Sequence, residues 1–174
     1  SFYRISKQSS ELFIESFSES FGIDFSILRY GSLYGERSNS LNSIHRLIKS
    51  AILERKITYY GDGNEMREFI HVKDAANLSV EALDSKYNNQ ILMLTGTKSI
   101  KYIDLLNMIN EILNDKIKIE MFPKKSKNHY RMTPYSYNPK TAKKLISNPH
   151  IDLGQGLLNQ IDLFHKSIHS DKID

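Results

Sequence analysis

The sequence contains no cysteine, which excludes disulfide bonds, thiolate catalysis and zinc or iron–sulfur sites built on cysteine. It also contains no apolar run approaching the ~20 residues that a membrane-spanning helix needs. Its six histidines show no metal-ligand spacing, since His165 and His169 stand four residues apart without a third ligand. We therefore expect a protein without a metal or a membrane segment, and the lack of cysteine is compatible with the cytoplasmic location that we expect.

A glycine-rich turn of the kind that binds dinucleotides is missing as well. None of the eight glycines forms G-x-x-G-x-x-G or G-x-G-x-x-G after an expected strand. A dinucleotide-binding fold needs such a turn so that the backbone can approach the pyrophosphate at a helix N-terminus. Any dinucleotide site on this chain is therefore expected to be incomplete.

The composition fits one domain or a large part of one. The chain has 174 residues, of which 40% are hydrophobic and 25% charged, both ordinary for a soluble protein. The net charge of +4 is mild, and part of it comes from the segment PKKSKNHYR at residues 123–131. We interpret this segment as a solvated loop, with a site for an anionic ligand such as a diphosphate, or for nucleic acid, as the alternatives.

Helical and strand-like stretches alternate along the chain, which predicts an α/β fold. We expect helices over residues 3–21, 41–55, 74–85, 99–113, 138–146 and 156–169. Strands are expected over residues 24–30, 56–60, 67–72, 90–96 and 116–122, and residues 31–40 are interpreted as a loop. Gly22 is a plausible C-cap of the first helix, while Ser99 and Asn138 are the expected N-caps of two later helices.

Tyr3 and Lys7 stand four residues apart in the segment YRISK, at the start of the first expected helix. This spacing puts both side chains on one face, about one turn apart. A free tyrosine has a pKa of about 10. A neighbouring ammonium group favours the phenolate, so the pair can exchange a proton with a sugar or alcohol hydroxyl. A chain this rich in tyrosine and lysine is expected to contain such a pair by chance, so the pair alone does not identify a catalytic site.

Three blocks in a fixed order give the pair a context: YRISKQSSE at 3–11, LRYGSLYGER at 28–37 and YYGDGNEMREFIHVKDAA at 59–76. They resemble the patterns Y-x-x-S-K-x-x-x-E, L-R-Y-x-N-x-Y-G-P-R and Y-G-D-G-x-x-x-R-D-F-I-H-V-x-D of the extended short-chain dehydrogenase/reductase family. More narrowly, they resemble its NAD-dependent nucleotide-sugar epimerases and dehydratases. The third block is the most specific, and the later segments 138–146 and 154–167 resemble the family's closing helices.

The resemblance covers most of the chain, but only the C-terminal part of the family's usual protein. It implies the last strands and helices of a Rossmann-type sheet plus the small nucleotide-sugar-binding domain, as a single fragment over residues 1–174. In family members, the glycine-rich NAD turn and a catalytic Ser or Thr precede the tyrosine. The N-terminal NAD-binding half is therefore expected to be absent from this chain.

The resemblance also implies roles for individual residues. Tyr3 matches the catalytic acid/base, and Lys7 matches the lysine that lowers the tyrosine's pKa and holds the nicotinamide ribose of NAD. Arg67 matches the arginine that binds the diphosphate of the nucleotide sugar, and Arg131 matches a second phosphate-binding arginine. Two further residues either line the substrate pocket or are simply packed aromatics, namely Tyr60 and Tyr34.

Several positions depart from the family patterns. Ser32 stands where an asparagine usually contacts the sugar nucleotide, so a shorter hydroxyl takes the substrate-binding position. Glu36 replaces a proline and adds a negative charge near a site for an anion, and Glu68 replaces an aspartate. Arg4 stands in place of a common glycine, and Asn138 in place of an aspartate. These changes indicate either an unusual substrate or a degraded enzyme.

The implied function is that of an NAD-dependent epimerase or dehydratase acting on a nucleotide-diphosphate sugar, as part of a longer enzyme. In the family's 4,6-dehydratases, an acidic pair precedes the catalytic tyrosine, in the part that we expect to be absent here. The sequence therefore does not distinguish an epimerase from a dehydratase. A non-catalytic fragment that binds a nucleotide sugar without independent activity is the alternative, and a nucleic-acid-binding protein that uses KKSKNHYR is a further one. The helix over residues 3–21 is expected to form a homodimer, as it commonly does in the family. Loss of the N-terminal half should expose a sheet edge and apolar helix faces.

Overall fold

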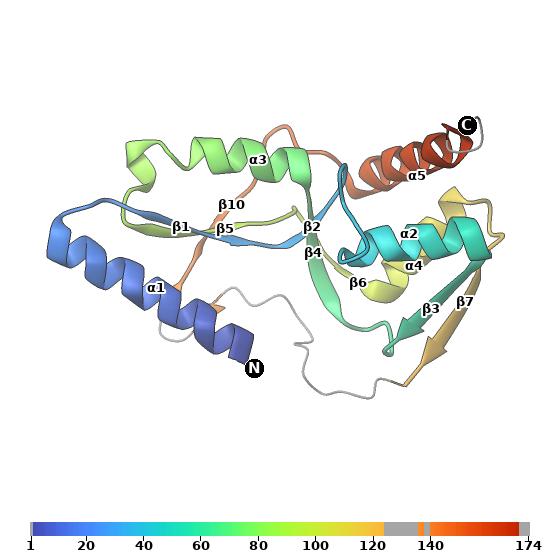
Figure 1. Cartoon of the computed structure of the whole chain (residues 1–174), viewed down its shortest axis with the longest axis horizontal. Coiled ribbons are helices and arrows are strands. Elements are labelled where there is room, and N and C mark those ends of the chain that lie inside the picture. Colours follow the sequence, from blue (N-terminus) through green and yellow to red (C-terminus); the bar gives the residue numbers. More distant parts are fainter. Residues whose placement is uncertain (1, 124–135, 138–139, 171–174) are drawn as a thin grey trace.

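The computed structural model describes residues 2–123, 136–137 and 140–170 of the chain. Within these residues the strands form two three-stranded and two two-stranded sheets, with helices between them (Figure 1). No helix in the part of the chain that the structure describes is both long and apolar enough to cross a membrane.

One half of the structure is a parallel sheet between two helices. The sheet has the order β1–β5–β10, which are Ser26–Tyr30, Gln90–Leu94 and Lys143–Leu145. Helices α1 (Phe2–Phe21) and α3 (Val72–Glu81) lie on opposite faces of this sheet (Figure 1). The α3 face carries the apolar contacts, made by Ile70, Ala75, Leu78, Ala82, Tyr87, Leu92 and Leu94. This arrangement confirms the prediction of an α/β fold with a parallel sheet.

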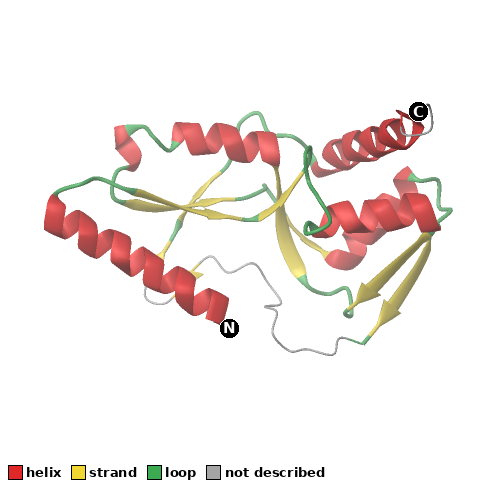
Figure 2. Cartoon of the chain, viewed as in Figure 1, coloured by secondary structure: helices red, strands yellow, loops and turns green. Residues whose placement is uncertain are grey.

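The other half gathers three helices over the remaining strands (Figure 2). Its sheets are β2–β4–β6 (Ser32–Tyr34, Met66–His71, Ser99–Lys101) and β3–β7 (Lys56–Tyr60, Lys118–Phe122). Its helices are α2 (Ser43–Glu54), α4 (Tyr102–Ile112) and α5 (Leu153–Ser170). Each helix buries one periodic apolar stripe in a shared core, with Ile44 and Ile48 from α2, Leu105 and Ile109 from α4, and Leu157 and Ile161 from α5.

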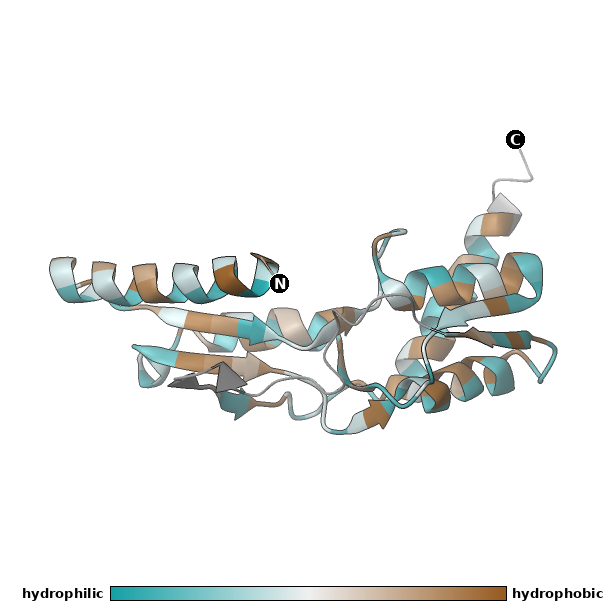
Figure 3. Cartoon of the chain, turned by 90° about the horizontal axis from the view of Figure 1, so that it is seen from below, coloured by the Kyte–Doolittle hydropathy of each residue, from teal (hydrophilic) through white to brown (hydrophobic). Residues whose placement is uncertain are grey.

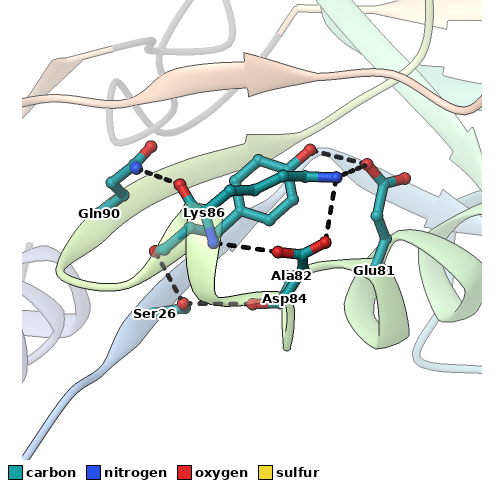
Figure 4. Close-up of polar contacts among 7 residues, drawn as sticks. Ser26, Glu81, Ala82, Asp84, Lys86 and Gln90 are labelled. Atoms are coloured by element: carbon teal, nitrogen blue, oxygen red, sulfur yellow. Dashed lines mark hydrogen bonds and ion pairs between the residues drawn. The ribbon is translucent and has the colours of Figure 1, made fainter.

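The connection from α3 to β5 is fastened to β1 by polar contacts (Figure 4). It contains the short 3-10 helix η1 (Ser85–Tyr87), whose N-cap Asp84 accepts a hydrogen bond from the Lys86 backbone at 3.0 Å. The Ser26 hydroxyl of β1 donates to the carbonyl oxygens of Ala82 at 3.3 Å and Tyr87 at 3.0 Å. These bonds fix where β5 begins and therefore set its register against β1.

Several predicted elements are confirmed with small shifts. The first helix ends at Gly22, which has φ 65° and donates to the Ser18 carbonyl at 2.8 Å. The second begins at Ser43 after the N-cap Asn42, so Leu41 lies outside it and is exposed. A short pair, β8 (Ser136–Tyr137) and β9 (Lys140–Thr141), completes the described strands.

Three predictions about local structure are wrong. The segment 138–146 does not form a helix over its described residues, because Lys143–Leu145 pairs with β5 as strand β10. Ser99 does not cap α4, because it lies in β6 opposite Glu68, and the N-cap of α4 is Lys101 without a side-chain bond. Residues 31–40 are not only a loop, because Ser32–Tyr34 forms β2 beside β4. Asn138 lies outside the described residues.

Candidate functional site

Tyr3 and Lys7 share one face of α1, as their spacing predicts. The Lys7 Nζ lies 5.6 Å from the centroid of the Tyr3 ring, within the range of a cation–π contact. The Tyr3 side chain is exposed, and its backbone carbonyl accepts a hydrogen bond from the Ser6 hydroxyl at 2.9 Å. The pair is therefore assembled and accessible, which is what a proton-exchanging tyrosine requires.

A bidentate ion pair joins α1 to the parallel sheet. The Arg29 guanidinium of β1 donates through Nε at 2.8 Å and Nη2 at 2.6 Å to the two carboxylate oxygens of Glu11. Both side chains are largely buried, with 8% and 17% exposed. Since Glu11 stands one turn after Lys7, this contact sets where the Tyr3–Lys7 face lies relative to β1.

The arginine expected to bind the diphosphate, Arg67, lies in β4 and is only 7% exposed. Its Nη1 donates to the Met66 carbonyl at 2.6 Å, and its Cζ lies 5.9 Å from the centroid of the Tyr102 ring. Tyr102 is the first residue of α4, and its ring stacks on Tyr59 at 5.0 Å. Arg67 thus lies beside the Tyr102 ring, which is itself stacked on Tyr59.

The glycine turn before β4 places a carboxylate at the hydroxyl of Tyr59. The Tyr59 hydroxyl donates to Glu65 at 2.9 Å, and both burial and this bond raise the pKa of Tyr59. A Cβ on Gly61 would lie 2.5 Å from the Glu65 carboxylate and 2.7 Å from the Tyr59 ring, so a side chain there would displace one of them. The sequence Y-G-D-G therefore allows the Tyr59–Glu65 bond to form beside Arg67.

Two other expected site residues, Ser32 and Tyr60, lie on two different strands. Ser32 of β2 pairs with Phe69 of β4, and strand alternation puts Ser32, Phe69 and Arg67 on one face of that sheet. Tyr60 of β3 is 59% exposed, and its ring centroid lies 5.8 Å from that of Phe122. Arg131 lies outside the described residues.

Tyr34 is packed inside the protein. It is 3% exposed, and its ring meets His71 edge-on at 5.2 Å. Its hydroxyl has no hydrogen-bond partner among the described residues, and burial raises the pKa of Tyr34. Tyr34 also lines an open cleft of about 650 Å³ between residues 33–42 and the start of α3. Tyr34 is thus a packed aromatic residue, and its place in a substrate pocket stays a prediction.

Two acidic residues that depart from the family patterns are paired with lysines. Glu36 accepts an ion pair from Lys73 at 2.7 Å, and the hydrogen bond from Lys73 lowers the pKa of Glu36. Glu68 is almost fully buried and accepts from Lys144 of β10 at 2.9 Å. The negative charge that Glu36 adds near the site is thus compensated locally. No group of three metal-ligating side chains occurs within the described residues.

A model of a known protein family matches slightly more than half of the chain. Residues 1–93 match the model of the NAD dependent epimerase/dehydratase family, so the chain belongs to this family. It is 27% identical to a UDP-glucuronate 4-epimerase of Thermodesulfobacterium geofontis over 168 residues, which are 95% of this chain and 51% of that protein. The chain spans about half the length of the curated relatives it matches.

Two solved structures show the same fold. The UDP-glucuronic acid 4-epimerase of Bacillus cereus, in complex with UDP-glucuronic acid and NAD, matches at a TM-score of 0.78 and 25% identity. That match covers 94% of this chain and 52% of that one. The UDP-glucose 4-epimerase of Thermotoga maritima with UDP-glucose matches at a TM-score of 0.77 and 20% identity, over 94% and 53% of the two chains. The expected Rossmann-type architecture and family are therefore confirmed.

Sequence reasoning missed Tyr59, Glu65 and Tyr102 as neighbours of Arg67. A signal for Tyr59 was available, because alternation along β3 puts Tyr59 on the side of the buried Ile57 and Tyr60 on the other. Tyr102 had no local signal, since it reaches Arg67 only through the pairing of β6 with β4.

Proposed function

We propose that this chain is the substrate-side half of a longer NAD-dependent epimerase or dehydratase that acts on a nucleotide-diphosphate sugar. The observation that carries the proposal is that Tyr3 and Lys7 meet on one face of α1 in a chain that belongs to this family. Relatives of twice its length that bind UDP-sugars and NAD support it. A cytoplasmic location stays a prediction.

Each residue has a separate task in this proposal. Tyr3 takes the proton of a sugar hydroxyl on its phenolic oxygen and later returns it, while Lys7 would hold the nicotinamide ribose. NAD, when bound, accepts and returns the hydride. Arg67, together with Arg131, binds the diphosphate, because a planar guanidinium matches phosphate oxygens in a bidentate way. Ser32 and Tyr60 complete the proposed substrate contacts.

We also propose that α1 supplies a homodimer interface. None of its residues is fully buried, and its apolar residues Phe2, Ile5, Leu12, Phe13, Phe17 and Phe21 are all exposed. Figure 3 shows α1 as an outer layer with apolar residues along its length. The polar Glu11 faces the sheet, so the apolar face is left for another surface. The expected exposure of an apolar helix face is confirmed; the dimer itself is the proposal.

A calorimetric titration tests the proposed function. The chain is titrated with UDP-glucuronic acid and UDP-glucose, and separately with NAD. Arg67→Ala should weaken UDP-sugar binding about ten- to hundredfold, because one charge-assisted contact to phosphate is lost. Arg46→Ala is the control, since Arg46 is exposed on α2 and its guanidinium donates to the backbone carbonyls of Ser40 and Leu41. Its affinity should equal that of the wild type.

The outcomes separate the alternatives. UDP-sugar binding that Arg67→Ala weakens, without NAD binding, supports the substrate-side half of a longer enzyme. Tight NAD binding contradicts the incomplete cofactor site. Binding of neither ligand contradicts the proposal and favours a fragment without independent function.

A further inference from the structure

The Tyr102 ring is fixed from several directions at once. Its backbone nitrogen donates to the Glu65 carbonyl at 3.0 Å, and its hydroxyl donates to the Ser43 hydroxyl at 3.2 Å. One face stacks on the Tyr59 ring, with the ring planes 24° apart. Phe69 meets it edge-on at 6.0 Å. A side chain held at its backbone, hydroxyl, face and edge has little rotational freedom left.

This fixed ring lies beside the Arg67 guanidinium. Arg67 pairs across the sheet with Ile100, two residues before Tyr102, and its Cζ lies 5.9 Å from the ring centroid. An aromatic face attracts a guanidinium and favours stacked arrangements of the two planes. The Arg67 charge also reaches the second ring, because it opposes the rise in the pKa of Tyr59 that burial causes.

We propose that Tyr102 is a positioning residue for Arg67, whose ring holds the guanidinium in the orientation that binds the diphosphate. This inference rests on the proposed function for the identity of the ligand. A guanidinium that is oriented in advance loses less conformational entropy when phosphate binds, so the ring raises affinity without touching the substrate. The ring carries this role, and the hydroxyl serves only to fasten the ring to Ser43.

Two variants separate the ring from the hydroxyl. Tyr102→Phe keeps the ring and loses the bond to Ser43, so its affinity for UDP should stay within about twofold of the wild type. Tyr102→Leu removes the aromatic face and should weaken UDP binding about three- to tenfold. In an Arg67→Ala background, Tyr102→Leu should cause no further loss, because its effect passes through Arg67. A merely structural role would weaken binding equally in both backgrounds.

A second measurement needs no substrate. Phenylglyoxal modifies accessible guanidinium groups, and peptide mass mapping gives the rate at each arginine. Arg29 is an internal reference, because it is 9% exposed against 7% for Arg67 and lies in the other sheet. Tyr102→Leu should raise the rate at Arg67 several-fold relative to Arg29, and Tyr102→Phe should leave the ratio unchanged.

The two measurements distinguish failure of this inference from failure of the proposed function. If the wild type binds UDP and Tyr102→Leu changes neither the affinity nor the Arg67 rate, the positioning role is overturned and the proposed function stands. If the wild type does not bind UDP, the proposed function fails. The ratio of the modification rates at Arg67 and Arg29 then tests the positioning role by itself. A selective rise at Arg67 then supports the positioning role, while an equal rise at Arg29 indicates general loosening and overturns it.

Discussion

Replacing Glu11 with glutamine should detach α1 from the sheet before the rest of the chain unfolds. The Arg29–Glu11 pair is bidentate and largely buried, whereas the large apolar side chains of α1 are exposed. Removing one partner of a buried ion pair typically costs about 3–5 kcal/mol, since the other charge stays desolvated. Glu11 retains some exposure, so we expect about 2–4 kcal/mol for the docking of α1.

Hydrogen exchange read by mass spectrometry measures this loss where it occurs. A loss of about 2–4 kcal/mol corresponds to an increase of roughly one and a half to three decades in α1 exchange, limited by the rate of a free peptide. Exchange in α4, which is packed in the other core, should not change. Asp162→Asn is the control, because it breaks an exposed pair with Lys166 on α5 and should cost under about 0.5 kcal/mol. Unchanged α1 exchange in Glu11→Gln would mean that the ion pair does not hold α1 on the sheet.

Three other perturbations give separate tests. Gly63→Ala should destabilise the chain by about 2–3 kcal/mol in urea unfolding and Gly22→Ala by only about 1 kcal/mol. Both glycines have a positive φ, but only at Gly63 would an added Cβ contact α4, at 2.9 Å from Ile103. Equal losses of stability in the two variants would contradict a role for this contact. Hydrogen bonds from Lys118 and Lys56 lower the pKa of Glu120 from 4.5 to about 2. The stability that this contributes is present above pH 4.5 and lost toward pH 2, so Glu120→Gln should lower the urea midpoint at pH 6 and match the wild type near pH 2. Phe17→Glu on α1 should shift sedimentation toward the monomer, and an unchanged oligomer would exclude this face from the interface.

Elements with local signals were predictable from the sequence. The apolar periodicity of α2 and α5 and the buried runs of β1 and β5 place these elements within a few residues. Gly22 ends α1 because a positive φ favours glycine, and this rule needs no tertiary information.

Elements defined by distant pairing were not predictable. Residues 143–145 look like part of a helix but pair with β5, which lies about fifty residues earlier, and that pairing outweighs the local preference. Ser99 is a residue type that commonly caps helices, yet it lies in strand β6, where it pairs with Glu68 of β4.

The residues of the candidate site also differ in whether local sequence predicts them. Tyr3, Lys7 and Arg67 came from motif blocks that are contiguous in sequence, and the structure shows the first two together on one helix face. Tyr102 approaches Arg67 from 35 positions away, so no local pattern indicates the contact.

The most direct test of the central claim is a crystal structure of this chain grown with UDP-glucuronic acid. We expect diphosphate oxygens within hydrogen-bonding distance of the Arg67 guanidinium, with the Tyr102 ring still stacked against Tyr59. A nucleotide sugar bound with its diphosphate away from Arg67, for example in the cleft beside Arg37, would show that Arg67 is not the diphosphate-binding residue.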